Sequence, residues 1–261
     1  MKLELIKYDL FDKYKADVKV TPSEILKNAE RSELKVDYFD FYDSVSSVYS
    51  SKIEGEDVDY DSYYKHKFLK VKFKADYTRR ADDLFKAYKL IQKKDLSAEN
   101  IFQAHSTLSR HLLPKTDQGK IRDNIMVVIN SKGGIEYSAA VPAIIKKELN
   151  KLFRDIETLK KAELSDLETF YFAAYIHLVF VKIHPFQDGN GRTARLLEKW
   201  FLIKKLGDPA YSVQSEKNYY LKLKDYYSNL RKLGTDYETL DYTKCLDFLL
   251  MTVNSINDGD V

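Results

Sequence analysis

Apolar side chains recur at helical spacing along most of the chain, and one stretch dominates this pattern. LETFYFAAYIHLVFVKI (167–183) is apolar on nearly every face, which is typical of a helix that other helices surround. Helical spacing resumes in GRTARLLEKWFLIKKLG (191–207). The pattern therefore predicts two central helices joined by a short loop that starts at His184.

Further stretches with helical spacing lie on both sides of this pair. They are residues 36–56, which end near Gly55 as a natural stop, 63–94 as one or two amphipathic helices, 98–113 behind Ser97 as a cap, 141–159, and two or three helices within 212–257. The chain has only nine glycines and five prolines, so few breaks interrupt these stretches.

One segment has the pattern of strands. IMVVIN (125–130) and IEYSA (135–139) flank SKGG, which predicts a β-hairpin. The predicted fold class is therefore all-α, a helical bundle with one small β-hairpin. We expect residues 1–96 to form an N-terminal helical region and residues 97–257 to form a second part, with both packed as one unit.

Composition changes this picture little. Hydrophobic residues make up 44% of the 261 positions, enough for a sizeable core, and the formal net charge is +3. Cys245 stands alone, which excludes an internal disulfide and a structural cysteine–zinc site. The N-terminus has no apolar signal core, and FYFAAYIHLVFVKI (170–183) is too short to span a bilayer comfortably. We therefore expect a soluble, cytoplasmic protein without a membrane partner.

One basic and aromatic stretch, KHKFLKVKFK (65–74), raises the question of nucleic-acid binding. A solvated helix face is the simpler interpretation, because the mild overall charge lacks the dense basic footprint of a dedicated nucleic-acid binder. We do not expect nucleic acid as a partner.

The loop between the central helices, HPFQDGNGRTAR (184–195), concentrates small and polar residues. Gly189 and Gly191 allow a ligand to approach the backbone, and Asn190 tolerates the left-handed conformation that a nest of amides requires. Unpaired amides at a helix start and the helix dipole together favour an anion. Arg192 and Arg195, three residues apart, project from one side of the first turn and are suited to grip phosphate oxygens.

Two further residues complete the chemistry of this loop. Asp188 lies at its mouth and would repel phosphates unless a cation lay between them, which points to Mg²⁺ held by one carboxylate and by phosphates. His184, just before Pro185, is suited to take a proton from a hydroxyl group that attacks the bound phosphate. A purely structural turn is the alternative, but the joint occurrence of these groups favours a phosphate site.

These residues resemble the signature of Fic domains (filamentation induced by cyclic AMP), H-P-F-x-[D/E]-G-N-G-R-x-x-R, at every position. The resemblance extends from about residue 98 to about residue 250, through HSTLSRHLLPKTDQGKIR (105–122) ahead of the hairpin and NYYLKLKDYYSNL (218–230) beyond the central helices. It implies an adenylyltransferase, because Fic enzymes mostly transfer AMP from ATP to a hydroxyl group of a target protein and release pyrophosphate.

The resemblance also implies a role for each residue of the signature. His184 would be the general base on a Ser, Thr or Tyr of the target, and Asp188 would bind Mg²⁺ between the α- and β-phosphates. The hairpin, called the flap in this family, would pair with an extended segment of the target by strand addition. The other implied ATP contacts are the amides of Gly189, Asn190 and Gly191 around the phosphates, Arg192 on the β-phosphate, Arg195 on the γ-phosphate, and Thr193 and Ala194 within the signature.

The nucleotide pocket is less well defined by the resemblance. Tyr219 and Tyr220 are the candidates for the adenine pocket, with packing between helices as the equal alternative. Tyr227 stands where relatives often have asparagine, and SAAVP (138–142) follows the flap where they often have a proline-rich turn. The first departure concerns the choice of nucleotide, and the second concerns the mobility of the flap.

The stretch SSKIEG (50–55) resembles the family's inhibitory motif, [S/T]-x-x-x-E-[G/N], on a helix upstream of the signature. The resemblance implies that the Glu54 carboxylate pairs with Arg195, which misplaces the phosphates of ATP and prevents in-line attack. Ser50 would fix the helix end or form a hydrogen bond within the motif. A solvated glutamate before a helix stop is the alternative.

Several functions stay open at this point. Within the family, the alternatives to AMP transfer are the transfer of UMP, phosphocholine or phosphate, and the removal of AMP from the target. A helical interaction module without chemistry is the alternative from another class, and the intact signature speaks against it. The expected partners are ATP, Mg²⁺ and a target protein, and a homodimer is left open.

Overall fold

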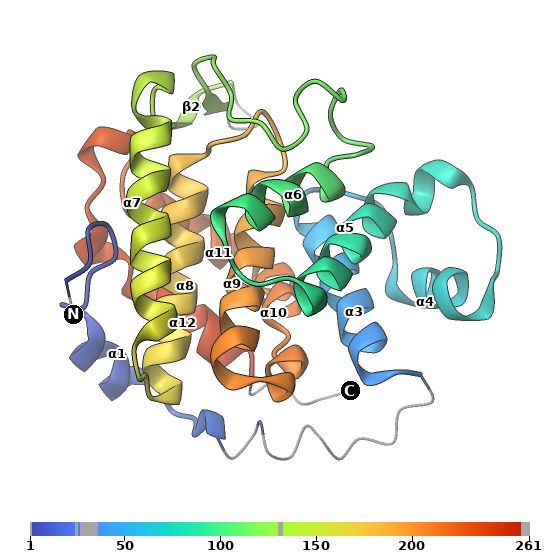
Figure 1. Cartoon of the computed structure of the whole chain (residues 1–261), viewed down its shortest axis with the longest axis horizontal. Helices are drawn as coiled ribbons and strands as arrows, with labels where there is room; N and C mark the ends of the chain where they lie inside the picture. The colour runs from blue at the N-terminus through green and yellow to red at the C-terminus, as the bar shows by residue number, and fades with distance from the viewer. Residues whose placement is uncertain (1, 24–25, 27–35, 130–132, 257–261) are drawn as a thin grey trace.

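Two consecutive helices, α8 (Asp166–Ile183) and α9 (Asn190–Leu206), pack along each other at the centre of the molecule (Figure 1). The computed structural model describes residues 2–23, 26, 36–129 and 133–256. α8 begins with a capping box, in which the Ser165 hydroxyl accepts from the Glu168 amide and the Glu168 carboxylate accepts from the Ser165 amide. Almost every residue of α8 is buried, as its sequence predicts.

The remaining helices surround this pair. They are α1 (Phe11–Asp17), α3 (Tyr38–Ile53), α4 (Tyr60–Leu69), α5 (Ala75–Lys93), α6 (Ala98–Leu108), α7 (Pro142–Lys161), α10 (Ser215–Leu221), α11 (Leu223–Arg231) and α12 (Leu246–Asn254), with short 3₁₀ helices at Asp208–Ser212, Tyr237–Thr239 and Tyr242–Lys244. The helical stretches predicted from the apolar pattern are confirmed, including the division of residues 63–94 into two helices, α4 and α5.

The predicted ends of two helices are confirmed as well. Ser97 caps α6, where its hydroxyl accepts from the Asn100 amide at 3.3 Å. Glu54 is the C-cap of α3, and Gly55 follows with a φ of 84°, a conformation that favours glycine. The chain turns away from the helix at Gly55, which leaves the side chain of Glu54 at the end of α3.

One hydrophobic core joins both parts of the chain. Ile6, Ile53 and Leu84 from the N-terminal part lie in the same buried cluster as Phe180 and Trp200 from the central helices. Residues from both parts of the chain thus share one core, while the division into two parts at 96/97 stays a prediction and residue 257 lies outside the described residues.

The one predicted hairpin is confirmed. β1 (Val127–Ile129) pairs antiparallel with β2 (Ile135–Ser138), with an irregularity in register between Val128 and Ile129. Residues 130–132 of the predicted connection lie outside the described residues. β2 is also fastened to the chain before the second 3₁₀ helix, since the Ser138 amide donates to the Thr235 carbonyl at 2.8 Å. The hairpin lies near the end of the central helix pair where the connecting loop runs (Figure 1).

In the described part of the chain, no helix combines the length and apolar character needed to cross a bilayer.

Candidate functional site

The loop between α8 and α9 is held by its own side chains. The Asn190 side chain accepts from the Phe186 amide and donates to the Phe186 carbonyl, both at 2.8 Å. The Thr193 hydroxyl donates to the carbonyl of Gly189, which caps α9 with a φ of 79°. These bonds fix the loop before any ligand is present, and they direct the side chains of Asn190 and Thr193 into the loop itself.

A second layer supports the loop from α6. The His105 ring stacks on Phe186 with ring centroids 3.6 Å apart, and its Nε2 lies 2.9 Å from the Asp188 carbonyl. Its Nδ1 accepts from the Gly119 amide at 2.9 Å, which leaves the proton on Nε2. A side chain at Gly189 would contact the same ring and Leu108. Phe186 is buried.

His184 ends α8 in the left-handed conformation, with a φ of 53°. Its Nδ1 lies 3.1 Å from the Val181 carbonyl, so this nitrogen carries the proton and Nε2 is left as a proton acceptor. Burial lowers the pKa of His184, which keeps the ring neutral near pH 7. The Arg122 guanidinium holds the backbone of His184 in place, since it donates to the carbonyls of His184, Asn124 and Ala140.

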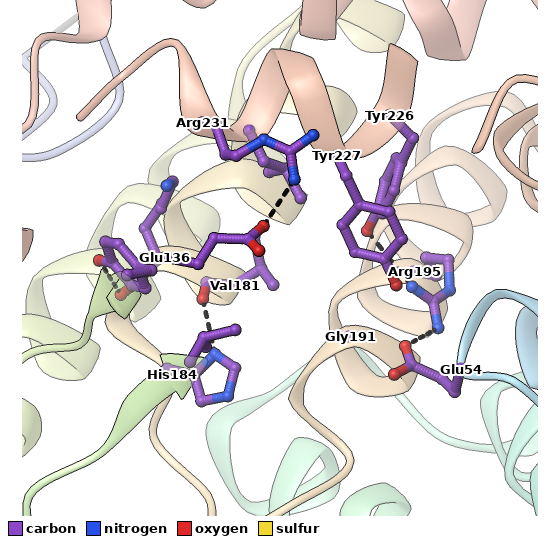
Figure 2. Close-up of a pocket in the computed structure, with 13 residues that line it drawn as sticks. Glu54, Glu136, Val181, His184, Gly191, Arg195, Tyr226, Tyr227 and Arg231 are labelled. Atoms are coloured by element: carbon purple, nitrogen blue, oxygen red, sulfur yellow. Dashed lines mark hydrogen bonds and ion pairs between the residues drawn. The ribbon is translucent and has the colours of Figure 1, made fainter. Parts of the chain in front are cut away.

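A cavity of about 290 Å³ opens beside His184. Figure 2 shows His184 on one side of this cavity and the pair of Glu54 and Arg195 on the other. Side chains from the flap, α8, α9 and α11 and from the end of α3 form its walls: Glu54, Val128, Glu136, Tyr137, Val181, Lys182, His184, Gly191, Arg195, Tyr226, Tyr227, Leu230 and Arg231.

The predicted pair of Glu54 and Arg195 is present in the structure. Arg195 Nη2 donates to Glu54 Oε1 at 2.5 Å, and Arg195 is buried within α9. Ser50 contributes twice, since its hydroxyl accepts from Arg195 Nε at 2.8 Å and its carbonyl accepts from Nη2 at 3.1 Å. Burial alone would raise the pKa of Glu54, but Arg195 and Arg192 outweigh it, so the pKa is lowered.

The Glu54 carboxylate also lies over the start of α9. A side chain at Gly191 would overlap Glu54 Oε1, so the carboxylate sits directly on the backbone of the first turn. That turn has the unpaired amides and the positive end of the helix dipole, which favour an anion. The carboxylate therefore occupies the part of the cavity that is suited to a phosphate.

Arg192 is held by a second acid that the sequence analysis missed. Its Nη2 donates to Glu56 Oε1 at 2.9 Å, and Arg80 Nη1 donates to the same oxygen at 2.6 Å. Arg192 is buried, and its Nε has no partner among the described residues. The only sequence signal was the spacing of Glu56, two residues after Glu54 and beyond the turn at Gly55.

The structure does not place the two predicted adenine-pocket tyrosines in the lining of the cavity. Tyr219 is buried in the core, where its hydroxyl donates to Glu198 and meets Thr252, both at 2.7 Å. Tyr220 packs against Tyr49 and Lys52.

Tyr226 and Tyr227 line the cavity in their place (Figure 2). The rings of Tyr219 and Tyr226 contact each other, with centroids 4.9 Å apart, although the helix is interrupted at Lys222 between α10 and α11. Tyr227, where relatives often have asparagine, donates to the Ile53 carbonyl at 3.1 Å and so fastens the end of α3.

Asp188 is exposed at the mouth of the loop, where its Oδ1 accepts from the Gly189 amide at 2.6 Å. Among residues 2–23, 26, 36–129 and 133–256, no three acidic, histidine or cysteine side chains cluster as a metal site would require. A single carboxylate with one free oxygen fits Mg²⁺ only if phosphate oxygens and water complete the coordination. The donor set thus fits a metal that arrives with a nucleotide.

Comparison with known proteins agrees with this geometry. The family model described as the Fic/DOC family matches residues 95–202, which include the whole loop and most of both central helices. Among curated proteins, the protein adenylyltransferase Fic of Drosophila persimilis is 31% identical over 131 residues, 50% of this chain and 24% of that protein. The protein of the same name from Nematostella vectensis is 31% identical over 144 residues, 55% of this chain and 30% of that protein. The chain therefore spans less than a third of the length of these relatives.

Solved structures share the fold over nearly the whole chain. The crystal structure of a Fic family protein from Desulfovibrio desulfuricans has a TM-score of 0.75 at 18% identity, and the match covers 99% of this chain and 76% of that one. A Fic domain containing signaling protein from Bacteroides thetaiotaomicron has a TM-score of 0.63 at 20% identity, with 95% and 93% covered.

Proposed function

We propose that this chain, which contains a Fic domain, transfers AMP from ATP to a Ser, Thr or Tyr hydroxyl group of a target protein. The observation that carries the proposal is the cavity that is lined by the His184 imidazole, whose pKa is lowered, by Gly191 in the first turn of α9 and by the buried Arg195. Such a site combines a proton acceptor with an anion site, which is what nucleotidyl transfer to a hydroxyl group requires.

Each residue of the candidate site would have a separate role in the reaction. The amides at the start of α9, with Arg192 and Arg195, would bind the phosphates and orient the leaving pyrophosphate. The target hydroxyl oxygen would form a bond to the α-phosphorus while the bond from this phosphorus to the oxygen bridging to the β-phosphate breaks. His184 Nε2 would accept the hydroxyl proton, since Nδ1 is engaged with the Val181 carbonyl. The products are the AMP-modified target and pyrophosphate.

Asp188 is the residue that would hold Mg²⁺ together with the phosphates, and the ion would neutralise the charge of the leaving pyrophosphate. The bond from the Gly189 amide orients this carboxylate before the nucleotide binds.

The flap is suited to present the target. Ile129 and Ile135 are 64% and 65% exposed, although both are apolar. Within the described part of the chain, β1 pairs only with β2, so its outer edge is open to strand addition. Arg122 links the flap's two ends, at Asn124 and Ala140, to the His184 carbonyl. A segment bound to the flap would therefore lie beside the imidazole.

Autoinhibition by the end of α3 is part of the proposal. Glu54 pairs with Arg195 and lies over Gly191, while Glu56 pairs with Arg192. Glu54 and Glu56 thus occupy the two arginines that would bind phosphates. Their negative charge would also repel the phosphates of ATP. ATP bound under these conditions would have misplaced phosphates, so the in-line geometry would be lost.

The test compares ATP labelled on the α-phosphate with ATP labelled on the γ-phosphate. The Glu54→Gly variant should label itself or a protein in a lysate with the α-label only, and the increase in mass should be that of one AMP group. Transfer of the γ-label would indicate phosphate transfer, and labelling by UTP alone would indicate UMP transfer. Absence of any transfer, in a folded Glu54→Gly protein supplied with Mg²⁺ and lysate, would refute the proposal.

The proposed location is the cytoplasm, where ATP, Mg²⁺ and target proteins are available together.

A further inference from the structure

Arg195 is held mostly by the segment that blocks it. Its guanidinium makes four hydrogen bonds within the described part of the chain, three of them to Ser50 and Glu54 at the end of α3. The fourth runs from Nη1 to the Tyr226 hydroxyl at 3.3 Å. Tyr226 is therefore the one described hydrogen-bond partner of Arg195 that would stay in place if the end of α3 moved away (Figure 2).

The Tyr226 hydroxyl is itself oriented by residues from the central helices. His177 on α8 lies with Nε2 3.1 Å from this oxygen, and its Nδ1 lies 2.7 Å from Glu198 Oε2 on α9. The side chains of Tyr226, His177 and Glu198 are all buried. A buried network of this kind holds its members in one arrangement, because any broken bond leaves an unpaired polar group without water.

The order of donors and acceptors along this network follows from its first member. A guanidinium can only donate, so the Tyr226 oxygen accepts from Arg195 and its own proton is free to go to His177 Nε2. The proton of the His177 ring is then on Nδ1, where it donates to the Glu198 carboxylate. Burial lowers the pKa of His177, which favours the neutral ring that this order requires. The chain of bonds thus leads from a buried cation to a buried anion.

We propose that Tyr226, oriented by His177 and Glu198, is a positioning residue that holds Arg195 in the pose needed for the γ-phosphate. The proposal rests on the proposed function, because it takes the γ-phosphate as the ligand of Arg195. The long arginine side chain would otherwise have to be ordered by the nucleotide alone, at a cost in conformational entropy. Three hydrogen bonds in series connect the Glu198 carboxylate to the guanidinium and polarise one another, which favours the orientation of Tyr226.

The test uses the difference between ATP and ADP, since only ATP carries a γ-phosphate. The background is the Glu54→Gly/Ser50→Ala double variant, which removes two of the four hydrogen bonds on Arg195. In this background Tyr226→Phe should weaken the binding of Mg²⁺–ATP roughly tenfold, the effect of losing one hydrogen bond to a charged group. The binding of Mg²⁺–ADP should change less than about twofold. Titration calorimetry measures both dissociation constants.

Two further variants separate positioning from packing. His177→Asn keeps a donor for Glu198 but removes the acceptor for Tyr226, so it should also weaken ATP selectively. Tyr175→Phe alters a buried tyrosine on α8 that does not line the cavity, and it should change the affinity for neither nucleotide. Thermal melting of each variant checks the fold, and if Tyr226→Phe does not fold, His177→Asn decides.

The outcomes distinguish this inference from the function on which it rests. If ATP does not bind to the folded background variant, the proposed function fails. If ATP binds there, but Tyr226→Phe and His177→Asn weaken ATP and ADP equally or weaken neither, the positioning role is overturned.

Discussion

Glu54 and Arg195, which are 141 residues apart in the chain, form an ion pair of 2.5 Å across the candidate site. The contact joins the end of α3 to the first turn of α9, so two segments from different parts of the chain meet at the position suited to a phosphate.

Removal of the Glu54 carboxylate should increase AMP transfer at least tenfold. The expected size is that of a hydrogen-bonded ion pair, about 1.5–3 kcal/mol, that no longer competes with the nucleotide. The measurement is the initial rate of self-modification by Glu54→Gly with α-labelled ATP.

Two controls separate charge from backbone in this experiment. Glu54→Gln keeps the side chain's size and should give a smaller increase than Glu54→Gly. Asp57→Gly changes an exposed acid of the same segment and should leave the rate near that of the unaltered protein. Equal rates for Glu54→Gly and the unaltered protein would contradict the inhibitory role.

Glu56 should also inhibit transfer, through its ion pair with Arg192. Adding Glu56→Gln to Glu54→Gly should raise transfer several-fold further, because Arg192 then becomes available to a phosphate. Arg80→Gln is a control that should not increase transfer. It removes the other partner of Glu56 and leaves that carboxylate to Arg192 alone, so transfer should be no higher than in Glu54→Gly. A transfer rate in the Glu54→Gly/Glu56→Gln variant equal to that of Glu54→Gly would show that the pair of Glu56 and Arg192 does not restrain transfer.

His184 should be required for transfer but not for nucleotide binding. In the Glu54→Gly background, His184→Ala should lower the transfer rate by about 10²–10⁴-fold, the usual contribution of a general base. The affinity for Mg²⁺–ATP, measured by calorimetry, should stay within a few-fold, because the proposed phosphate contacts come from α9 and not from His184. A rate that persists in His184→Ala would remove the residue from the proposed mechanism.

The pH dependence of transfer should follow the neutral form of His184. Burial lowers its pKa below the ordinary value of 6.5, and Arg122 acts in the same direction, while Val181, Glu54 and Asp188 oppose them. The base is neutral above its pKa, so transfer should be lost as the pH falls through a midpoint below 6.5. Single-turnover rates of Glu54→Gly from about pH 5 to 8 measure the midpoint. Melting curves at each pH exclude unfolding, and a midpoint above 6.5 would argue against His184 as the base.

Arg122 should be needed to hold the flap and the His184 imidazole in their relative positions. A lysine at this position cannot reach the three carbonyls that Arg122 binds, those of His184, Asn124 and Ala140. Arg122→Lys should therefore lower the free energy of unfolding by about 1–3 kcal/mol and should also lower transfer in the Glu54→Gly background. Arg110→Lys, at an exposed position of the same segment, is the matched control for both measurements. Unchanged melting and transfer in Arg122→Lys would contradict this role.

Much of the fold follows from the local sequence. The apolar residues on nearly every face of α8 predict a central helix, and Gly55 predicts the end of α3. SKGG between two segments with the pattern of strands predicts the hairpin. These features depend on residues that are close in the chain, so spacing and turn chemistry are sufficient to find them. The loop from His184 to Arg195 is local in the same sense, but its left-handed residues are His184 and Gly189 rather than Asn190, which is the first residue of α9.

The contacts between distant segments could not be derived in the same way. The pairing of Glu54 with Arg195 was expected only from a resemblance, and Glu56 was missed because its partners lie 24 and 136 residues away. The resemblance offers Tyr219 and Tyr220 for the adenine pocket, but which tyrosines of 218–230 line the cavity depends on how α10 and α11 pack, which spacing along the chain does not determine.

The turn at Gly55 places Glu54 and Glu56 on one short segment of backbone. Glu54 ends α3, and Glu56 follows just past the glycine, so each carboxylate reaches a different arginine from the same corner of the backbone. A pull on that corner of about 5 Å, the rise of one helical turn, would break both ion pairs in a single movement. The two restraints would then be released together, so the response to such a force would be steep rather than graded.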